Sequence, residues 1–63
     1  MPLVTVTMIE GRPAEAKRAL IREVTDAVER TLAAPRPSIR VILQEVPAAH
    51  WGVAGEAKDR SPQ

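Results

Sequence analysis

Proline is the second residue of this chain and leads directly into an apolar segment, Leu3 to Ile9. Methionine aminopeptidases remove the first methionine when the second residue is small, and proline qualifies. Removal of Met1 would turn Pro2 into a free secondary amine at the start of a strand. An amine fixed in that position is a candidate general base or nucleophile. With Met1 retained, Pro2 would be an ordinary amide and this chemistry would be absent.

Two arginines at strand ends, Arg12 and Arg40, are candidate partners for the Pro2 amine. A guanidinium can bind a carboxylate through two parallel hydrogen bonds and stabilise charge that develops on an oxygen. A base that acts at neutral pH must be largely unprotonated, and nearby positive charge or apolar surroundings lower the pKa of an amine. The apolar residues that could surround Pro2 are Ile9, Trp51 and Val53. The competing interpretation of the arginines is surface ion pairing, and that of Trp51 is core or interface packing.

Two apolar strands and one helix must position these residues. The β-branched segment Leu3–Ile9 predicts a strand, which ends at Glu10-Gly11-Arg12-Pro13. A helix is expected from about Pro13 to about Ala33, and Ile39–Val46 predicts a second strand. Strands joined by a helix of this length form a right-handed β-α-β unit with parallel strands. The predicted fold class is therefore α/β.

The helix has a recognisable apolar stripe. Apolar or small residues recur at spacings of three and four, which is typical of one buried helix face. The stripe consists of Leu20, Val24, Ala27, Val28 and Thr31, with Ile21 and Leu32 beside it. Asp26 has oppositely charged neighbours one turn away in Arg22 and Arg30, and such pairs stabilise a helix by tenths of a kcal/mol, about 0.2–0.5. No Ser, Thr, Asp or Asn precedes Pro13, so the helix start lacks a side-chain cap.

The remaining tail is short and rich in small residues. Ala48 to Gly55 contains Gly52 and Gly55, which favour a tight hairpin or a closely packed loop. Glu56 to Gln63 is polar and is expected to fray. The chain of 63 residues is one domain, residues 1–63, with no repeat and no linker.

The composition excludes several classes of protein. Nine basic residues nearly balance eight acidic ones, so there is no basic field for nucleic acid and no polybasic patch for a membrane. No apolar run approaches the roughly 20 residues of a membrane span, and the N-terminus does not resemble a signal peptide. The chain has no cysteine, and His50 alone cannot build a metal site. A cytoplasmic protein without a metal is predicted.

The size of the chain argues for self-association. A domain of this length buries only about 60% of its unfolded surface and is marginal without a staple or a partner. A two-stranded sheet covers one face with its own helix and leaves the other face bare. The sequence therefore predicts an oligomer.

Five short motifs follow one another along nearly the whole chain. They are Met1-Pro2 before a strand, Glu10-Gly11-Arg12 at its end, Leu20–Val24 in the helix, Ser38–Ile42 at the second strand and His50–Gly55 in the tail. In this order and spacing they resemble the 4-oxalocrotonate tautomerase family, the short members of the tautomerase superfamily. Each motif is weak alone, and the combination is specific.

The resemblance implies a homohexamer, assembled as a trimer of dimers, with active sites built by neighbouring subunits. It implies a cofactor-independent isomerase of aromatic degradation, which catalyses 1,3-keto–enol tautomerisation of an unsaturated 2-oxo or 2-hydroxy dicarboxylate such as 2-hydroxymuconate. Pro2 would be the base that moves a proton between the enol oxygen and carbon. Arg12 would bind the distal carboxylate, and Arg40 from an adjacent subunit would hold the carboxylate and oxo group beside the reacting centre. Trp51 stands where the family usually places a phenylalanine, as an apolar wall of a pocket that would also include Ile9.

Two other functions compete with this one. A haloacrylate dehalogenase or hydratase could use the same amine to direct water, but that chemistry uses an extra tail carboxylate, and the segment between Trp51 and Gly55 has none. A non-catalytic oligomeric binding module is the third possibility. The sequence leaves open the physiological substrate and the presence of a second kind of subunit.

Overall fold

The centre of the molecule is a sheet of two parallel strands, β1 (Leu3–Ile9) and β2 (Arg40–Val46). The structure, a computed structural model, describes residues 1–60 of the chain. The strands are in full register, from Leu3 opposite Arg40 to Ile9 opposite Val46. Because they are parallel, both begin at one end of the sheet, here called the amino end, and both finish at the carboxyl end. The predicted β-α-β unit with parallel strands is confirmed.

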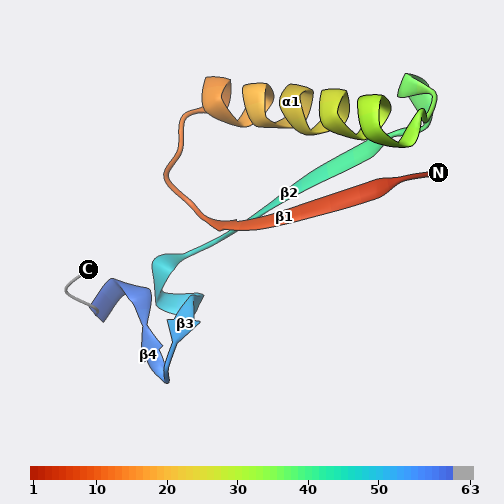
Figure 1. Cartoon of the computed structure of the whole chain (residues 1–63). Coiled ribbons are helices and arrows are strands. Elements are labelled where there is room, and N and C mark those ends of the chain that lie inside the picture. The colour runs from red at the N-terminus through yellow and green to blue at the C-terminus, as the bar shows by residue number, and fades with distance from the viewer. Residues whose placement is uncertain (61–63) are drawn as a thin grey trace.

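The helix α1 (Ala14–Leu32) connects the two strands and lies over one face of the sheet (Figure 1). Burial alternates from Leu3 to Met8 and from Arg40 to Gln44, as expected for a sheet with one covered face. Val4, Val6 and Met8 of β1 and Val41 and Leu43 of β2 are the covered residues. The opposite face, here called the bare face, carries Leu3, Thr5, Thr7, Arg40, Ile42 and Gln44, all of them exposed.

Both ends of α1 have unusual caps. Pro13 occupies the N-cap position without a side-chain hydrogen bond, which confirms the predicted uncapped start. Ala33 occupies the C-cap position in the left-handed conformation, with φ of 54°, where glycine is the common residue. The 3-10 turn η1 (Arg36–Ser38) follows and delivers the chain to β2. The second strand therefore starts one residue later than predicted, because Ile39 still donates its N–H to Arg36 at 3.1 Å.

The tail after β2 forms its own small unit. It contains the 3-10 turn η2 (Ala48–His50), the antiparallel hairpin of β3 (Gly52–Val53) and β4 (Glu56–Ala57), and the 3-10 turn η3 (Lys58–Arg60). The predicted hairpin is confirmed. The expectation of a frayed chain from Glu56 onward does not hold for residues 56–60, because β3 pairs with β4 and the Lys58 N–H binds the Trp51 carbonyl. Residues 61–63 of that prediction lie outside the described residues.

The single chain has almost no core. Among residues 1–59, whose burial the structure describes, only Met8 and Ile39 are buried, and no residue of α1 is. The predicted apolar stripe of the helix is correct for Leu20, Val24, Ala27 and Val28, which are half-buried, and wrong for Thr31, which is exposed. Thr31 instead donates its hydroxyl to the Ala27 carbonyl one turn earlier. The chain is elongated, with extents of 42 × 24 × 15 Å, and no helix in residues 1–60 is long and apolar enough to span a membrane.

Candidate active site

Pro2 is attached to the amino end of the sheet. Its carbonyl accepts a hydrogen bond of 2.9 Å from the Arg40 N–H, which extends the ladder between the two strands by one step. Pro2 is half-buried, whereas Met1 is 85% exposed and extends away from the sheet. Removal of Met1 would therefore expose an amine whose position is fixed by the sheet.

Arg40 lies at the same end of the sheet, as the first residue of β2 and the register partner of Leu3. Its exposed side chain alternates with that of Val41 and so belongs to the bare face. The guanidinium Nη1 donates a hydrogen bond of 2.6 Å to the Pro37 carbonyl in η1. This bond turns the guanidinium toward the preceding turn and leaves its other N–H groups available for an anion.

Ile9 and Arg12 lie at the carboxyl end. The sheet ladder ends just beyond Ile9, where the Glu10 N–H binds the Val46 carbonyl at 2.9 Å. Gly11 then adopts φ of 124°, a conformation that L residues rarely take, and turns the chain toward α1. Arg12 is exposed, and its Nη1 lies 3.3 Å from the Ile9 carbonyl. The guanidinium is thus folded back over the end of β1.

Trp51 lies beyond the carboxyl end of β2, between η2 and β3. Its backbone is held at both groups, since its N–H donates to Ala48 at 3.1 Å and its carbonyl accepts from Lys58 at 2.8 Å. The side chain is half-buried, and Val53 nearby in the hairpin is 58% exposed. The tail thus holds the indole on a small bonded scaffold next to an exposed apolar residue.

One chain does not bring the five candidate residues together. Pro2 and Arg40 stand at the amino end, whereas Ile9, Arg12 and Trp51 stand at or beyond the carboxyl end. With a rise of about 3.3 Å per residue, the strand separates Pro2 from Ile9 by about 23 Å. The arginines and apolar residues that are expected to keep the Pro2 amine unprotonated are therefore divided between the two ends of a single chain. A second chain is needed to bring both sets of residues into one pocket.

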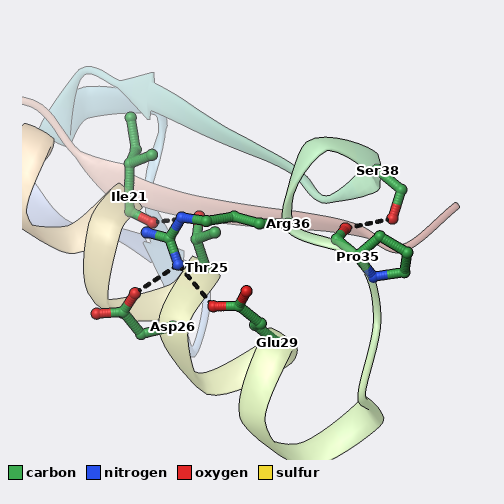
Figure 2. A network of polar contacts seen from close by, with 7 residues as sticks. All are labelled: Ile21, Thr25, Asp26, Glu29, Pro35, Arg36 and Ser38. Carbon is green, nitrogen blue, oxygen red and sulfur yellow. Dashed lines mark hydrogen bonds and ion pairs between the residues drawn. The ribbon is translucent and has the colours of Figure 1, made fainter.

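Sequence reasoning missed a charged cluster behind the amino end. Figure 2 shows Arg36 of η1 directed at two carboxylates of α1, those of Asp26 and Glu29. The expected pairing of Asp26 with Arg22 or Arg30 within the helix is replaced by this contact. The hydrogen bonds that Arg36 donates to the carboxylates of Asp26 and Glu29 raise the pKa of Arg36. The available signal was an arginine inside a proline-rich turn that follows a helix with acidic residues.

The described residues offer little for a metal ion. Within residues 1–60 no group of three or more His, Asp or Glu side chains lies close enough to bind one. The charges that could act on a substrate in the candidate site are the two guanidinium groups, Arg12 and Arg40. Such an arrangement suits an anionic substrate and a reaction in which negative charge develops on oxygen.

The chain is similar to known proteins along most of its length. A family model described as "Tautomerase enzyme" matches residues 2–60. A probable tautomerase of Ralstonia nicotianae is 62% identical over 63 residues, which cover 100% of this chain and 90% of that protein. The 2-hydroxymuconate tautomerase of Stutzerimonas stutzeri is 47% identical over 57 residues, 90% of each chain. A solved heterohexamer 4-oxalocrotonate tautomerase from Chloroflexus aurantiacus has a TM-score of 0.92 and 38% identity, covering 95% of this chain and 97% of that one.

Proposed function

This chain belongs to the tautomerase family, and we propose that it catalyses 1,3-keto–enol tautomerisation of an unsaturated 2-hydroxy or 2-oxo dicarboxylate such as 2-hydroxymuconate. The observation that carries the proposal is the attachment of Pro2 to the sheet beside Arg40, through the 2.9 Å bond from the Arg40 N–H to the Pro2 carbonyl. A base and an anion-binding group are thereby held at one end of a rigid element. The 47% identity to a 2-hydroxymuconate tautomerase supports the substrate class.

The proposed reaction moves one proton. After Met1 is removed, the unprotonated Pro2 nitrogen accepts the proton of the substrate 2-hydroxyl group and leaves a dienolate. The same nitrogen then delivers the proton to a carbon of the conjugated system, which gives the 2-oxo product and restores the free amine. No electrons are gained or lost, and a positioned base of this kind contributes on the order of 10²–10⁴-fold to the rate.

Two arginines complete the proposed site. Arg40 binds the carboxylate and oxygen next to the reacting centre and stabilises the negative charge of the dienolate. Arg12 binds the distal carboxylate, and Trp51 and Ile9 form the apolar wall that excludes water. Two guanidinium groups supply the positive charge that the enolate needs, so the proposed mechanism includes no cofactor.

The proposed site requires assembly, and the burial of the single chain supports it. Only Met8 and Ile39 of residues 1–59 are buried, and Leu3 and Ile42 of the bare face are 60% and 51% exposed. The radius of gyration is 14.7 Å, whereas a compact chain of this length has about 11 Å. We propose a homohexamer, a trimer of dimers, in which the bare faces are covered and the two ends of different chains meet. Sedimentation velocity measures the state directly, and a monomer would contradict it.

The proposed setting is aromatic degradation in the cytoplasm. A 2-hydroxymuconate-like diacid is a ring-cleavage product, which supports the first part. A chain without cysteine needs no oxidising compartment to fold, which supports the second.

The decisive experiment compares two forms that differ only at the Pro2 nitrogen. The intact mass first establishes that Met1 is absent, and the decay of 2-hydroxymuconate absorbance then gives the turnover. A form with one extra glycine before Pro2 keeps every side chain but converts the amine into an amide. We expect this form and Pro2→Ala to lose activity by on the order of 10²–10⁴-fold. Full activity in the blocked form would overturn the mechanism.

The same preparation separates the competing functions. Turnover of a haloacrylate, with no conversion of 2-hydroxymuconate, would favour the function of a haloacrylate dehalogenase or hydratase. Inactivity toward both compounds, with Met1 removed and the hexamer intact, would favour a binding module.

A further inference from the structure

Arg36, Asp26 and Glu29, here called the Arg36 cluster, connect the turn η1 to helix α1 (Figure 2). A single guanidinium nitrogen, Nη1 of Arg36, donates to Asp26 Oδ1 at 2.8 Å and to Glu29 Oε1 at 2.9 Å. The two acids are three residues apart on the helix, so their carboxylates share one face and repel each other unless a cation lies between them. The cluster therefore fixes η1 against the C-terminal half of α1.

The same turn supports Arg40. Pro37, the residue after Arg36, accepts the 2.6 Å hydrogen bond from Arg40 Nη1 through its carbonyl. The planar peptide unit of this carbonyl also carries the Ser38 N–H, which donates to the Pro35 carbonyl at 2.9 Å, so the direction of the Pro37 carbonyl follows the placement of η1 as a whole. The chain of contacts thus runs from α1 through Arg36 and Pro37 to the Arg40 guanidinium.

Other bonds hold the turn together without attaching it to the helix. The Ser38 N–H and hydroxyl both donate to the Pro35 carbonyl, at 2.9 and 2.7 Å. The Ile39 N–H donates to the Arg36 carbonyl at 3.1 Å. These bonds preserve the shape of η1, whereas the Arg36 side chain is what ties that shape to α1.

We propose that Arg36 is a positioning residue, which clamps η1 onto α1 and so orients the Arg40 guanidinium for the substrate carboxylate. The inference rests on the proposed function, because it takes Arg40 to be the carboxylate-binding group. An arginine that is already held in its bound orientation loses less conformational entropy when the substrate arrives. The clamp acts on substrate affinity and leaves the identity of the base unchanged.

A simple structural brace is the competing explanation, and the exposure of the cluster argues against it. The side chains of Arg36, Asp26 and Glu29 are 45%, 42% and 46% exposed. Ion pairs this exposed contribute little to the free energy of folding, because water and salt screen them. A brace would change the melting temperature and leave the kinetics alone. A positioning residue changes KM at nearly constant melting temperature.

The kinetic test uses Arg36→Ala, the double variant Asp26→Asn with Glu29→Gln, and the combination of all three. We expect KM for 2-hydroxymuconate to rise roughly three- to tenfold in each, within the range of couplings between contacting residues. The turnover number should stay within about twofold, since the base is intact. The combined variant should be no worse than Arg36→Ala, because all three remove the same clamp. Arg30→Ala removes an equal charge from the last turn of α1 and should leave KM unchanged.

A second measurement does not depend on activity. The Nε–H signal of Arg40 in a ¹H–¹⁵N spectrum reports the surroundings of the guanidinium directly. We expect this signal to move toward the position of a free arginine in Arg36→Ala and in the double variant, and to stay in place in Arg30→Ala. An unmoved signal in both cluster variants would overturn the proposal, and so would a moved signal with unchanged KM.

The two measurements separate the failure of this inference from that of the proposed function. A wild-type protein without Met1 that does not convert 2-hydroxymuconate would refute the proposed function. The Arg40 signal would still decide whether the Arg36 cluster orients the guanidinium. Activity in the wild type, together with unaltered KM in all cluster variants, would refute the positioning role alone.

Discussion

The two ends of the β1–β2 sheet are held in different ways. At the amino end, the Pro2 carbonyl is bonded to Arg40, and Arg36 fixes the turn η1 to two carboxylates of α1. At the carboxyl end, the ion pair of Lys17 with Glu45, at 3.0 Å, links α1 to β2. The hairpin of β3 and β4 lies beyond that end (Figure 1). It is held by the pairing of its two strands and by the bond from the Lys58 N–H to the Trp51 carbonyl.

This difference matches the roles that we propose for the two ends. Proton transfer requires the base within a few tenths of an ångström of its correct place, and the amino end carries Pro2 and the more strongly tied arginine. Binding of a distal carboxylate tolerates more adjustment, and Arg12 at the carboxyl end is exposed and held by one long hydrogen bond. In the proposed hexamer, a complete site then combines residues from the rigid amino end of one or more chains with residues from the adaptable carboxyl end of another.

Mixing two defective chains gives the largest expected effect on this comparison. Pro2→Ala should lose on the order of 10²–10⁴-fold in activity, and Arg12→Ala about 10–100-fold. If the two residues serve one site from different chains, oligomers formed by refolding both variants together should regain about a quarter of the wild-type activity, because random assembly completes about one site in four. No recovery would show that both residues act within one chain.

The matched control mixes Pro2→Ala with Arg40→Ala. These two residues are neighbours at the amino end of one chain, whereas the family resemblance assigns Arg40 to an adjacent subunit. Recovery in this mixture would place Arg40 of one chain in the site of another. Absence of recovery here, with recovery in the Arg12 mixture, would assign Pro2 and Arg40 to the same chain.

A charge on the bare face should prevent the chains from assembling, so that the amino end of one chain does not reach the carboxyl end of another. Ile42 is 51% exposed on that face in the single chain, and we propose that assembly buries it. Ile42→Lys should weaken assembly by about 2 kcal/mol or more per site, since a charge without a partner would be buried. Sedimentation should then show smaller species, and activity should fall with them. Leu32→Lys makes the same exchange at the 65% exposed end of α1 and should leave the hexamer intact.

One alanine beyond each end of the sheet adopts the left-handed conformation. Ala33 at the end of α1 and Ala54 in the hairpin turn both have φ of 54°. This conformation costs an L residue about 1–2 kcal/mol relative to its preferred regions, and glycine avoids the clash. Ala33→Gly and Ala54→Gly should each raise the free energy of unfolding by roughly 0.5–1 kcal/mol, after the entropy lost by the more flexible unfolded chain.

Denaturant unfolding of the two glycine variants sharpens the comparison. Equal gains would mean that the hairpin unfolds together with the rest of the molecule. A gain for Ala33→Gly without one for Ala54→Gly would mean that the hairpin opens separately and that the carboxyl end is the less cooperative half. A lower free energy of unfolding in either variant would contradict the proposed backbone strain at that alanine.

The smallest effect is expected for the ion pair of Lys17 with Glu45. Both side chains are about 30% exposed, at 29% and 30%, so the interaction should contribute less than about 1 kcal/mol and should weaken with salt. A double-mutant cycle with Lys17→Met and Glu45→Gln measures the coupling by denaturant unfolding. A coupling well above that value would mean that the carboxyl end is braced as firmly as the amino end.

Most of the fold could be predicted from local patterns. The β-branched run of β1, the prolines that bound α1 and the glycines of the hairpin each act within a few residues, and the structure confirms the elements they predict. The tail after Gly55 was not predicted, because its order comes from the bond between Lys58 and Trp51 rather than from its own composition.

The candidate site was only partly accessible from the sequence. Motif positions identified Pro2, Arg12 and Arg40, but sequence order does not reveal that the strand places Arg12 at the opposite end from the other two. The Arg36 cluster was missed because Asp26 has oppositely charged neighbours at helical spacing, so the sequence predicted ion pairs within α1. The actual partner lies ten residues away and is brought back by a turn between two prolines.

The near absence of a core has a consequence for the way the enzyme responds to its own abundance. With only Met8 and Ile39 buried among residues 1–59, the proposed assembly supplies the apolar burial that keeps each chain folded. Its melting temperature should then rise with protein concentration, by mass action. On dilution, assembly and catalysis should disappear together, so activity should fall more steeply than the amount of protein.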